Sequence, residues 1–255
     1  MNGLEIGSQV ISMTVFLAGK TGRASFQKTE VKIEIKMNSL QKIGGVAALI
    51  HSAAYLVGIG LYLAVLGPII DATPTQYVAL LANYQTTMYV WILIAYVVAG
   101  FCLVAVALAL HERLKAGSPA VMQIATALGL IWAGLIIGSG NLMIHGFDQV
   151  ANLYAKSPAQ AETVWLALKI VEDGIVSANE LIGGVWVLLV SWSALQTATL
   201  NKALNFLGVS IGVAGILTLI PALAEITQVI FGLSMIVWFA WAGILFLRNR
   251  PNIAL

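Results

Sequence analysis

Charge is the scarcest property of this sequence. Only 9% of its 255 residues are Asp, Glu, Lys or Arg, whereas a soluble domain carries about 25%. Hydrophobic residues make up 60% of the chain, and its mean hydropathy is +0.92. The formal net charge of +2 says little by itself, and we expect no nucleic-acid partner. We therefore interpret the chain as an integral membrane protein whose main surroundings are the lipid bilayer.

Cysteine and histidine are also scarce. Cys102 is the single cysteine, which excludes an intrachain disulfide and a metal site built from several thiolates. His51 and His145 lie near opposite ends of predicted membrane spans, roughly 20 Å apart in depth, too far to hold one haem between them. We expect no cofactor. The remaining metal alternative is a weak nitrogen–oxygen site for a divalent cation, formed by His145, Asp148, Glu180 and Glu225.

Long apolar runs dominate what is present. Each is about 20 residues or longer, as transmembrane helices require, and none shows the alternating pattern of barrel strands of about ten residues. The sequence therefore predicts an all-α integral membrane protein, a bundle of six transmembrane helices. The predicted spans are 43–66, 88–110, 121–145, 174–195, 203–220 and 225–247. We expect the connection 146–172 to include a surface helix.

The basic residues predict the orientation of the bundle, because loops on the cytoplasmic side are enriched in Lys and Arg. With the N-terminus in the cytoplasm, only Lys156 and Lys169 of the 13 Lys and Arg residues fall on the outer side. We therefore expect both termini in the cytoplasm, and a multi-pass protein of the bacterial cytoplasmic (inner) membrane.

The N-terminal residues do not resemble the rest of the chain. Residues 1–36 contain an apolar run too short to span a membrane and no basic start typical of a signal peptide. Met37 opens a segment that looks like a natural start. We interpret 1–36 as a poorly structured extension, or a mis-assigned start, before a transmembrane domain at 37–255.

Five blocks of the sequence resemble the bacterial DUF4386 family of small six-helix membrane proteins. The resemblance covers essentially Met37 to Arg250 and implies the six-helix topology, with no mechanism attached. The blocks are "MNSLQKIGGVAALIHSAAYLVG" (37–58), "ALHERLKAGSPA" (109–120), "LGLIWAGLIIGSG" (128–140), "NELIGGVWVLLVSWSAL" (179–195) and "VAGILTLIPAL" (213–223).

The fourth predicted span carries the most informative polar residues. Asp173 can sit at the outer water boundary with Glu172, while Asn179 and Glu180 lie inside the bundle, with Glu180 about 10 Å deeper than Asp173. Gly183 and Gly184 follow, so this side can approach a neighbouring helix closely. Ionisable residues inside a membrane are costly and are functional candidates by default. The alternative is a Glu180 that is protonated or hydrogen-bonded and fixes helix packing.

Other polar groups are predicted at the same outer level. We include His145, Asp148 and Glu225 with Asp173, Asn179 and Glu180 as candidate ligand- or ion-binding residues. Glu225 also has a simple alternative explanation, because an acidic group at a helix N-terminus is favoured by the helix dipole.

A stripe on the first span contains His51, Tyr55, Gly58 and Tyr62, which share one helical face directed at the bundle interior. We interpret His51 as a hydrogen-bonded packing residue. Glu112 and Lys115 are spaced for an ion pair, and Tyr89, Trp91 and Trp165 are typical interface anchors.

Two GxxxG pairs, Gly134 with Gly138 and Gly208 with Gly212, allow close helix contacts and suggest a homo-oligomer through Gly-rich faces.

Three functional classes stay open. The first is a membrane protein that binds or transports a small solute or cation through an outward-facing polar pocket. The second is a structural or accessory subunit without a site. The third is an intramembrane enzyme acting on lipid, which we rank last because the sequence has no Ser-His-Asp spacing and no histidine cluster.

Overall fold

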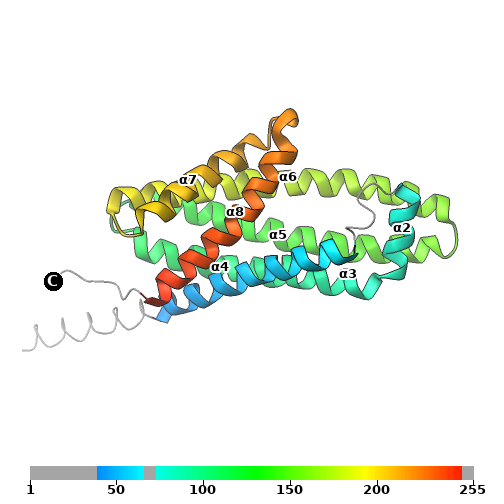
Figure 1. Ribbon diagram of the computed structural model, residues 1–255, viewed down its shortest axis with the longest axis horizontal. Helices are drawn as coiled ribbons and strands as arrows, with labels where there is room; N and C mark the ends of the chain where they lie inside the picture. The colour runs from blue at the N-terminus through cyan, green and yellow to red at the C-terminus, as the bar shows by residue number, and fades with distance from the viewer. Residues whose placement is uncertain (1–38, 66–72, 249–255) are drawn as a thin grey trace, which may run out of the picture. The chain divides into compact units, whose positions relative to one another are not determined.

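A computed structural model describes residues 39–65 and 73–248, and the described residues are helical apart from short turns, with no β-strand among them (Figure 1). The predicted extension 1–36 lies outside the described residues. A first helix covers Ser39–Val65. The others are α2 (Pro74–Asn83), α3 (Gln85–Ile92), the π-helical segment η2 (Leu93–Val98), α4 (Ala99–Leu114), α5 (Pro119–Tyr154), α6 (Pro158–Thr197), α7 (Lys202–Leu217) and α8 (Pro221–Arg248).

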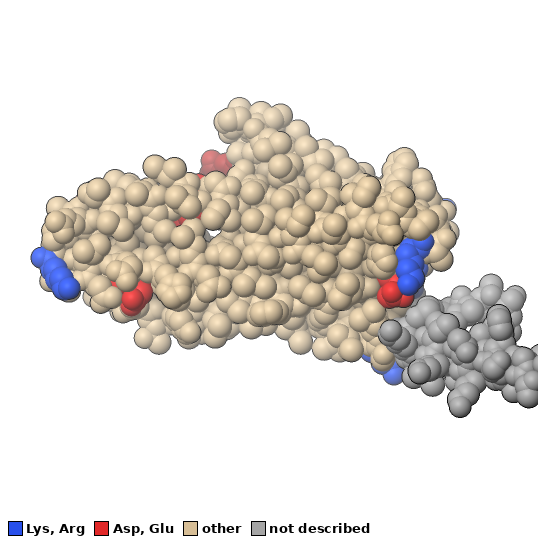
Figure 2. All heavy atoms as spheres, turned by 180° about the vertical axis from the view of Figure 1, so that it is seen from behind, with Lys and Arg blue, Asp and Glu red and all other residues tan. Residues whose placement is uncertain are grey.

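The helices confirm the membrane class. Five are long and apolar enough to cross a membrane: the first helix, the continuous α3–η2–α4 helix of 30 residues, α5, α6 and α8. The fifth predicted span corresponds to α7, which is apolar but has 16 residues, or about 24 Å of helix. Figure 2 shows that Lys and Arg lie toward two ends of the face in view, with a largely uncharged surface between them. The chain is thus an all-α, multi-pass membrane protein.

Local sequence sets where the helices begin and end. Pro119, Pro158 and Pro221 each occupy the first turn of a helix, where a missing backbone N–H costs nothing. Ala198 ends α6 in the left-handed region, with φ 51°. The Asn201 side chain then caps α7 by accepting a hydrogen bond of 2.8 Å from the backbone N–H of Ala203.

The helices that contain the third and fourth predicted spans are longer than those spans. α5 continues to Tyr154 and α6 begins at Pro158, so these helices have 36 and 40 residues and run side by side well beyond a ~30 Å hydrocarbon core (Figure 1). The polar residues of 146–172 are one face of two amphipathic helices. The opposite face is apolar and buried, so this stretch forms the packed ends of α5 and α6, where the sequence predicted a separate surface helix.

α2 packs against these extensions to form a small lobe, which we call the α2 lobe. Its core joins α2, α3 and the extended parts of α5 and α6. Trp165 was predicted as an interface anchor, but it is buried here and stacks on Tyr77 at 4.7 Å between ring centroids. Burial raises the pKa of the Tyr77 hydroxyl. The buried core residues are Val78, Leu81, Met88, Ile92, Met143, Phe147, Val150, Ala161 and Trp165.

Glycines hold α6 against α7. A Cβ atom on Gly184 would lie 2.9 Å from the Cα of Gly215 and 3.0 Å from the carbonyl oxygen of Gly212, so the two backbones touch directly. Gly208 and Gly212 therefore belong to a contact within the chain, which corrects their prediction as an oligomer face. Gly134 and Gly138 have open space around them, and an oligomer through that face stays a prediction.

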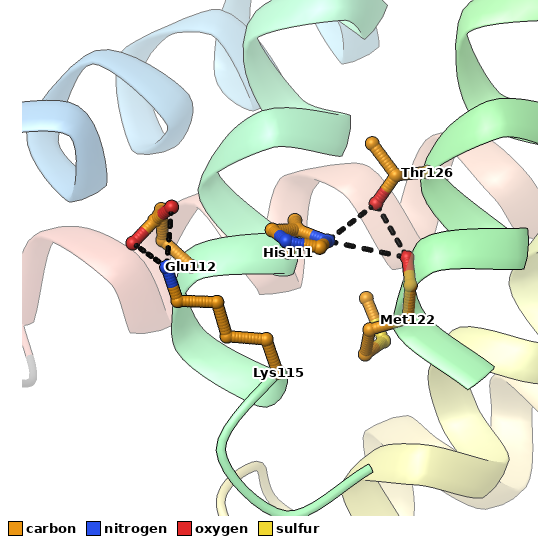
Figure 3. A network of polar contacts seen from close by, with 5 residues as sticks. All are labelled: His111, Glu112, Lys115, Met122 and Thr126. Atoms are coloured by element: carbon orange, nitrogen blue, oxygen red, sulfur yellow. Dashed lines mark hydrogen bonds and ion pairs between the residues drawn. The ribbon is translucent and has the colours of Figure 1, made fainter. Parts of the chain in front are cut away.

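The turn between α4 and α5 is held by polar contacts (Figure 3). Lys115 and Glu112 form the predicted ion pair at 2.7 Å. Thr126 donates to the carbonyl oxygen of Met122, so its hydroxyl oxygen accepts from Nδ1 of His111 at 2.8 Å. His111 therefore links α4 to α5 and serves packing.

Candidate ligand-binding cavity

A cavity of about 270 Å³ lies where the first helix separates from α8. Nearer the N-terminus of the first helix the two are in close contact, since the Ser52 hydroxyl donates to the carbonyl oxygen of Ile236 at 3.0 Å. Beyond this point, side chains from both helices and from α3, η2, α5 and α6 surround the space. They are Tyr55, Gly58, Ile59, Tyr62, Trp91, Ala95, Tyr96, Trp132, Ile136, Val176, Asn179, Glu180, Gln228, Phe231 and Gly232.

Glu180 is the charged residue of this lining. It is only 9% exposed, and Gln228 of α8 lies within hydrogen-bonding range of its carboxylate. No Lys, Arg or His is among the described residues that line the cavity, and none of the ion pairs between described residues includes Glu180. A buried carboxylate without a cationic partner is unfavourable unless a proton or a ligand neutralises it.

Asn179 is also 9% exposed, and its contacts determine which way its amide faces. The Ser139 hydroxyl donates its proton to the carbonyl oxygen of Leu135 at 2.8 Å. Ser139 can therefore only accept from Asn179, which donates through Nδ2 at 3.1 Å. The Oδ1 atom of Asn179 is left buried, with no hydrogen-bond partner within the described residues. Such a buried free acceptor is unfavourable by about 1–3 kcal/mol.

Aromatic rings form much of the remaining wall. Tyr62 and Trp91 have ring centroids 6.0 Å apart, and Trp91 meets Tyr96 edge-on at 5.9 Å. Trp132 and Phe231 lie 6.2 Å apart on another side. A Cβ on Gly183 would come within 2.6 Å of the Trp132 ring, so this glycine lets the ring sit against α6.

A second space of about 30 Å³ adjoins the cavity, shares four of its lining residues and is also lined by His51. Nδ1 of His51 lies 2.8 Å from the carbonyl oxygen of Ala99, which can only accept, so Nδ1 carries the proton. His51 is 2% exposed and packs on Phe239 at 4.0 Å between ring centroids. These contacts confirm its interpretation as a hydrogen-bonded packing residue.

The family model described as "Domain of unknown function (DUF4386)" matches residues 44–247. The chain belongs to the DUF4386 family. The match takes in every residue that lines the cavity. No curated protein and no solved structure matches the chain. Membership of the DUF4386 family therefore supports the predicted resemblance and leaves the activity to be argued from the cavity itself.

Asp173, seven residues before Glu180 on α6, has a different environment. Its side chain is 62% exposed, and it pairs with Lys169, which also lies 3.9 Å from Glu172. Asp173 thus lies on the surface, and its place at the outer water boundary stays a prediction. Glu172 departs from the prediction, because only 13% of its side chain is exposed.

His145 and Asp148 line a separate cavity of about 210 Å³ beside α3, where Gln85 donates to the Asp148 carboxylate at 2.9 Å. The predicted gathering of polar groups at one level is therefore divided between two cavities. Within residues 39–65 and 73–248, no group of three or more His, Cys, Asp or Glu side chains could hold a metal ion. That finding contradicts the hypothesis of a divalent-cation site.

Glu225 lies outside both cavities. It is exposed in the second turn of α8, and the first turn holds no acidic residue because the helix already begins at Pro221, so the helix-dipole explanation is not supported. Of the six predicted site residues, the structure thus brings together Asn179 and Glu180 and leaves Asp173, His145, Asp148 and Glu225 elsewhere. That any of them binds a ligand stays a prediction.

Sequence reasoning missed most of the aromatic wall. Trp91 was predicted as an interface anchor, but it lines the cavity, together with Tyr96, Trp132, Gln228 and Phe231. The usable signal was the stripe on the first helix, since Tyr55, Gly58 and Tyr62 all line the cavity as their shared face predicted. Aromatic residues on the other helices carry no such periodic polar pattern.

Proposed function

We propose that this protein binds a small solute in the cavity formed by the first helix, α3, η2, α5, α6 and α8. The observation that carries the proposal is the pair of adjacent buried groups, the Glu180 carboxylate and the free Oδ1 of Asn179, beside about 270 Å³ of space. Ligand pockets characteristically combine apolar walls with a few convergent polar groups. A purely structural role would leave these groups satisfied by the protein itself.

The topology we propose has six spanning helices, including the short α7, and both termini in the cytoplasm of a bacterial inner membrane. The distribution of Lys and Arg supports it. The first helix then runs outward, which places Tyr55 to Tyr62 and the cavity in the outer half of the bilayer. Labelling of K115C and K156C by a membrane-impermeant thiol reagent, in a C102A background, tests this arrangement: only K156C should react in intact cells.

The binding proposal is tested by a thermal-shift screen of small solutes on the full chain in detergent. Gly232 lines the cavity, and a Cβ placed on it meets no atom within 4 Å, so Gly232→Leu adds volume there without a forced clash. Gly134 has equally open space but lies outside the cavity lining, so Gly134→Leu is its matched control.

A solute at 100 times its Kd should stabilise the wild type and Gly134→Leu by about 2.7 kcal/mol and leave Gly232→Leu unchanged. Equal stabilisation of Gly232→Leu would place binding elsewhere and overturn the proposal. Uptake of the same solute into proteoliposomes then separates a transporter from a binding protein.

A further inference from the structure

We infer that the ligand of this cavity is a small organic cation, with an ammonium-type head group held by Glu180 and Asn179 and enclosed by aromatic rings. The inference rests on the proposed function, since it names the class of solute for the same cavity. Three independent properties of the lining lead to it: charge, hydrogen-bonding capacity and ring faces.

The charge of the lining is one-sided. Glu180 is 9% exposed, and no Lys, Arg or His is among the described residues that line the cavity, since His51 lines only the small adjoining space. An anionic ligand would add repulsion to an already unfavourable burial, and a neutral ligand would leave a bound proton as the compensation for the carboxylate charge. A cation would pair with the Glu180 carboxylate. The electrostatic attraction between them would offset the free-energy cost of burying that charge.

Asn179 and Glu180 both present hydrogen-bond acceptors to a ligand. Asn179 Oδ1 is a free acceptor because Ser139 holds the amide in one orientation. A carboxylate and an amide oxygen on consecutive residues call for a ligand that donates, as an ammonium N–H or a polarised C–H next to a cationic nitrogen does. A neutral ligand with a hydroxyl group could donate a hydrogen bond to Asn179 Oδ1, but it would bring no positive charge to pair with Glu180.

The aromatic walls distinguish an organic cation from a metal ion. Tyr62, Trp91 and Tyr96 form a continuous series of rings with centroids about 6 Å apart. Ring faces attract cations within about 6 Å and are the usual enclosure for quaternary ammonium groups. Mg²⁺ or Ca²⁺ is bound mainly by carboxylate and carbonyl oxygens, whereas this lining offers a single carboxylate and two side-chain amides on a largely apolar and aromatic wall.

The volume sets the size of the ligand. A space of about 270 Å³ is several times the roughly 30 Å³ that one water molecule occupies in the liquid. It therefore has room for an amine or quaternary ammonium group of roughly ten non-hydrogen atoms or fewer.

The test compares choline with 3,3-dimethylbutan-1-ol, in which carbon replaces the cationic nitrogen at the same shape. Tetramethylammonium and ethanolamine complete the cation set, and NaCl and KCl at equal ionic strength are included. Binding to the purified full chain in detergent is measured by calorimetry and by thermal shift. We expect at least one organic cation to bind at least tenfold more tightly than the neutral isostere, because only the cation is attracted electrostatically to the Glu180 carboxylate and to the ring faces.

Variants locate the bound cation. Glu180→Gln keeps the shape and removes the charge, and it should weaken cation binding about tenfold or more. Asp173→Asn, on the same helix and exposed, should leave the affinity unchanged. Tyr62→Leu removes a ring of the wall and should weaken binding about three- to thirtyfold. Tyr84→Leu removes a comparably exposed ring away from the lining and should have no effect.

The outcomes separate the inference from the proposed function. Equal binding of choline and its neutral isostere, or a wild-type affinity in Glu180→Gln, would overturn the cation inference while leaving a solute-binding cavity. Stabilisation by Na⁺ or K⁺ alone would also overturn it, in favour of an inorganic ion. Failure of every organic cation to bind the wild type overturns it too. If neutral solutes also fail, the proposed function falls with it. The choline comparison needs no variant, so a folding defect in one variant cannot decide the result.

Discussion

Two acidic sites on α6 lie seven residues apart and have opposite surroundings. Asp173 is 62% exposed on its side chain and is paired with Lys169, whereas Glu180 is 9% exposed and has no ion-pair partner among the described residues. Both positions have the same local conformation, about two helical turns apart. The comparison teaches that position within the bundle decides the role of a carboxylate, because a charge in water is cheap and a buried one needs compensation.

The contact that holds the buried site in place should give the largest effect. Gly184→Ala puts a Cβ against the backbone of α7, so the helices must separate; we expect a loss of about 3 kcal/mol or more in the free energy of unfolding, or failure to fold. Gly174→Ala, on the same helix with nothing within 4 Å, should be neutral or stabilising by about 0.5–1 kcal/mol. Thermal unfolding in detergent measures both. Similar losses in the two variants would contradict the close α6–α7 crossing.

Removing the charge of Glu180 or of Asp173 tests directly whether burial makes the difference between the two sites. Glu180→Gln should raise the stability of the ligand-free protein by about 1 kcal/mol or more, because a buried charge no longer needs compensation. Asp173→Asn should change it by less than about 0.5 kcal/mol, as exposed positions usually do. A clear loss of stability in Glu180→Gln would mean that the carboxylate is already satisfied within the bundle and would favour a packing role.

The orientation of Asn179 depends on one hydroxyl group. Ser139→Ala removes the acceptor for Nδ2 and frees the amide to turn, so we expect about 1 kcal/mol of destabilisation together with weaker ligand binding. Ser210→Ala removes a hydroxyl that donates only to its own helix, at the carbonyl oxygen of Phe206, and should leave binding unchanged. Calorimetric titration of both variants is the measurement, and unchanged affinity in Ser139→Ala would remove Asn179 from the site.

The exposed ion pairs should give the smallest effect. Lys169→Gln removes the partner of both Asp173 and Glu172, yet we expect a change of less than about 1 kcal/mol, because exposed pairs gain little in a high-dielectric environment. Thermal unfolding at low and high salt checks this. A larger, salt-insensitive loss would show that Lys169 is coupled to the buried side of α6.

Part of the cavity could be predicted from residue spacing. The stripe of Tyr55, Gly58 and Tyr62 and the burial of Asn179 and Glu180 beside Gly183 follow from helical periodicity, which places residues of one face together. Trp91, Tyr96 and Trp132 could not be assigned this way, because an aromatic residue in an apolar helix has the same local pattern whether it faces lipid, a neighbour or a cavity.

The polar residues predicted at one depth do not gather in one site, for a different reason. His145, Asp148, Asp173 and Glu225 were predicted to lie near Glu180 because they share a level along the bundle. Residues at one level can point to different sides of the bundle, and periodicity within a single helix contains no information about the rotation of its neighbours. The α2 lobe was missed because its helices bury apolar residues against each other and not against lipid.

By itself, the sequence determined the class, the family and the helical nature of this protein, since long apolar stretches must satisfy their backbone hydrogen bonds internally in a bilayer. It also determined that Glu180 would be buried, because the small residues beside it allow close packing. Only the tertiary structure decided which groups meet around the cavity and which stay apart. That result depends on where the first helix and α8 diverge and on how each helix is rotated, and both are set by contacts between residues far apart in the chain.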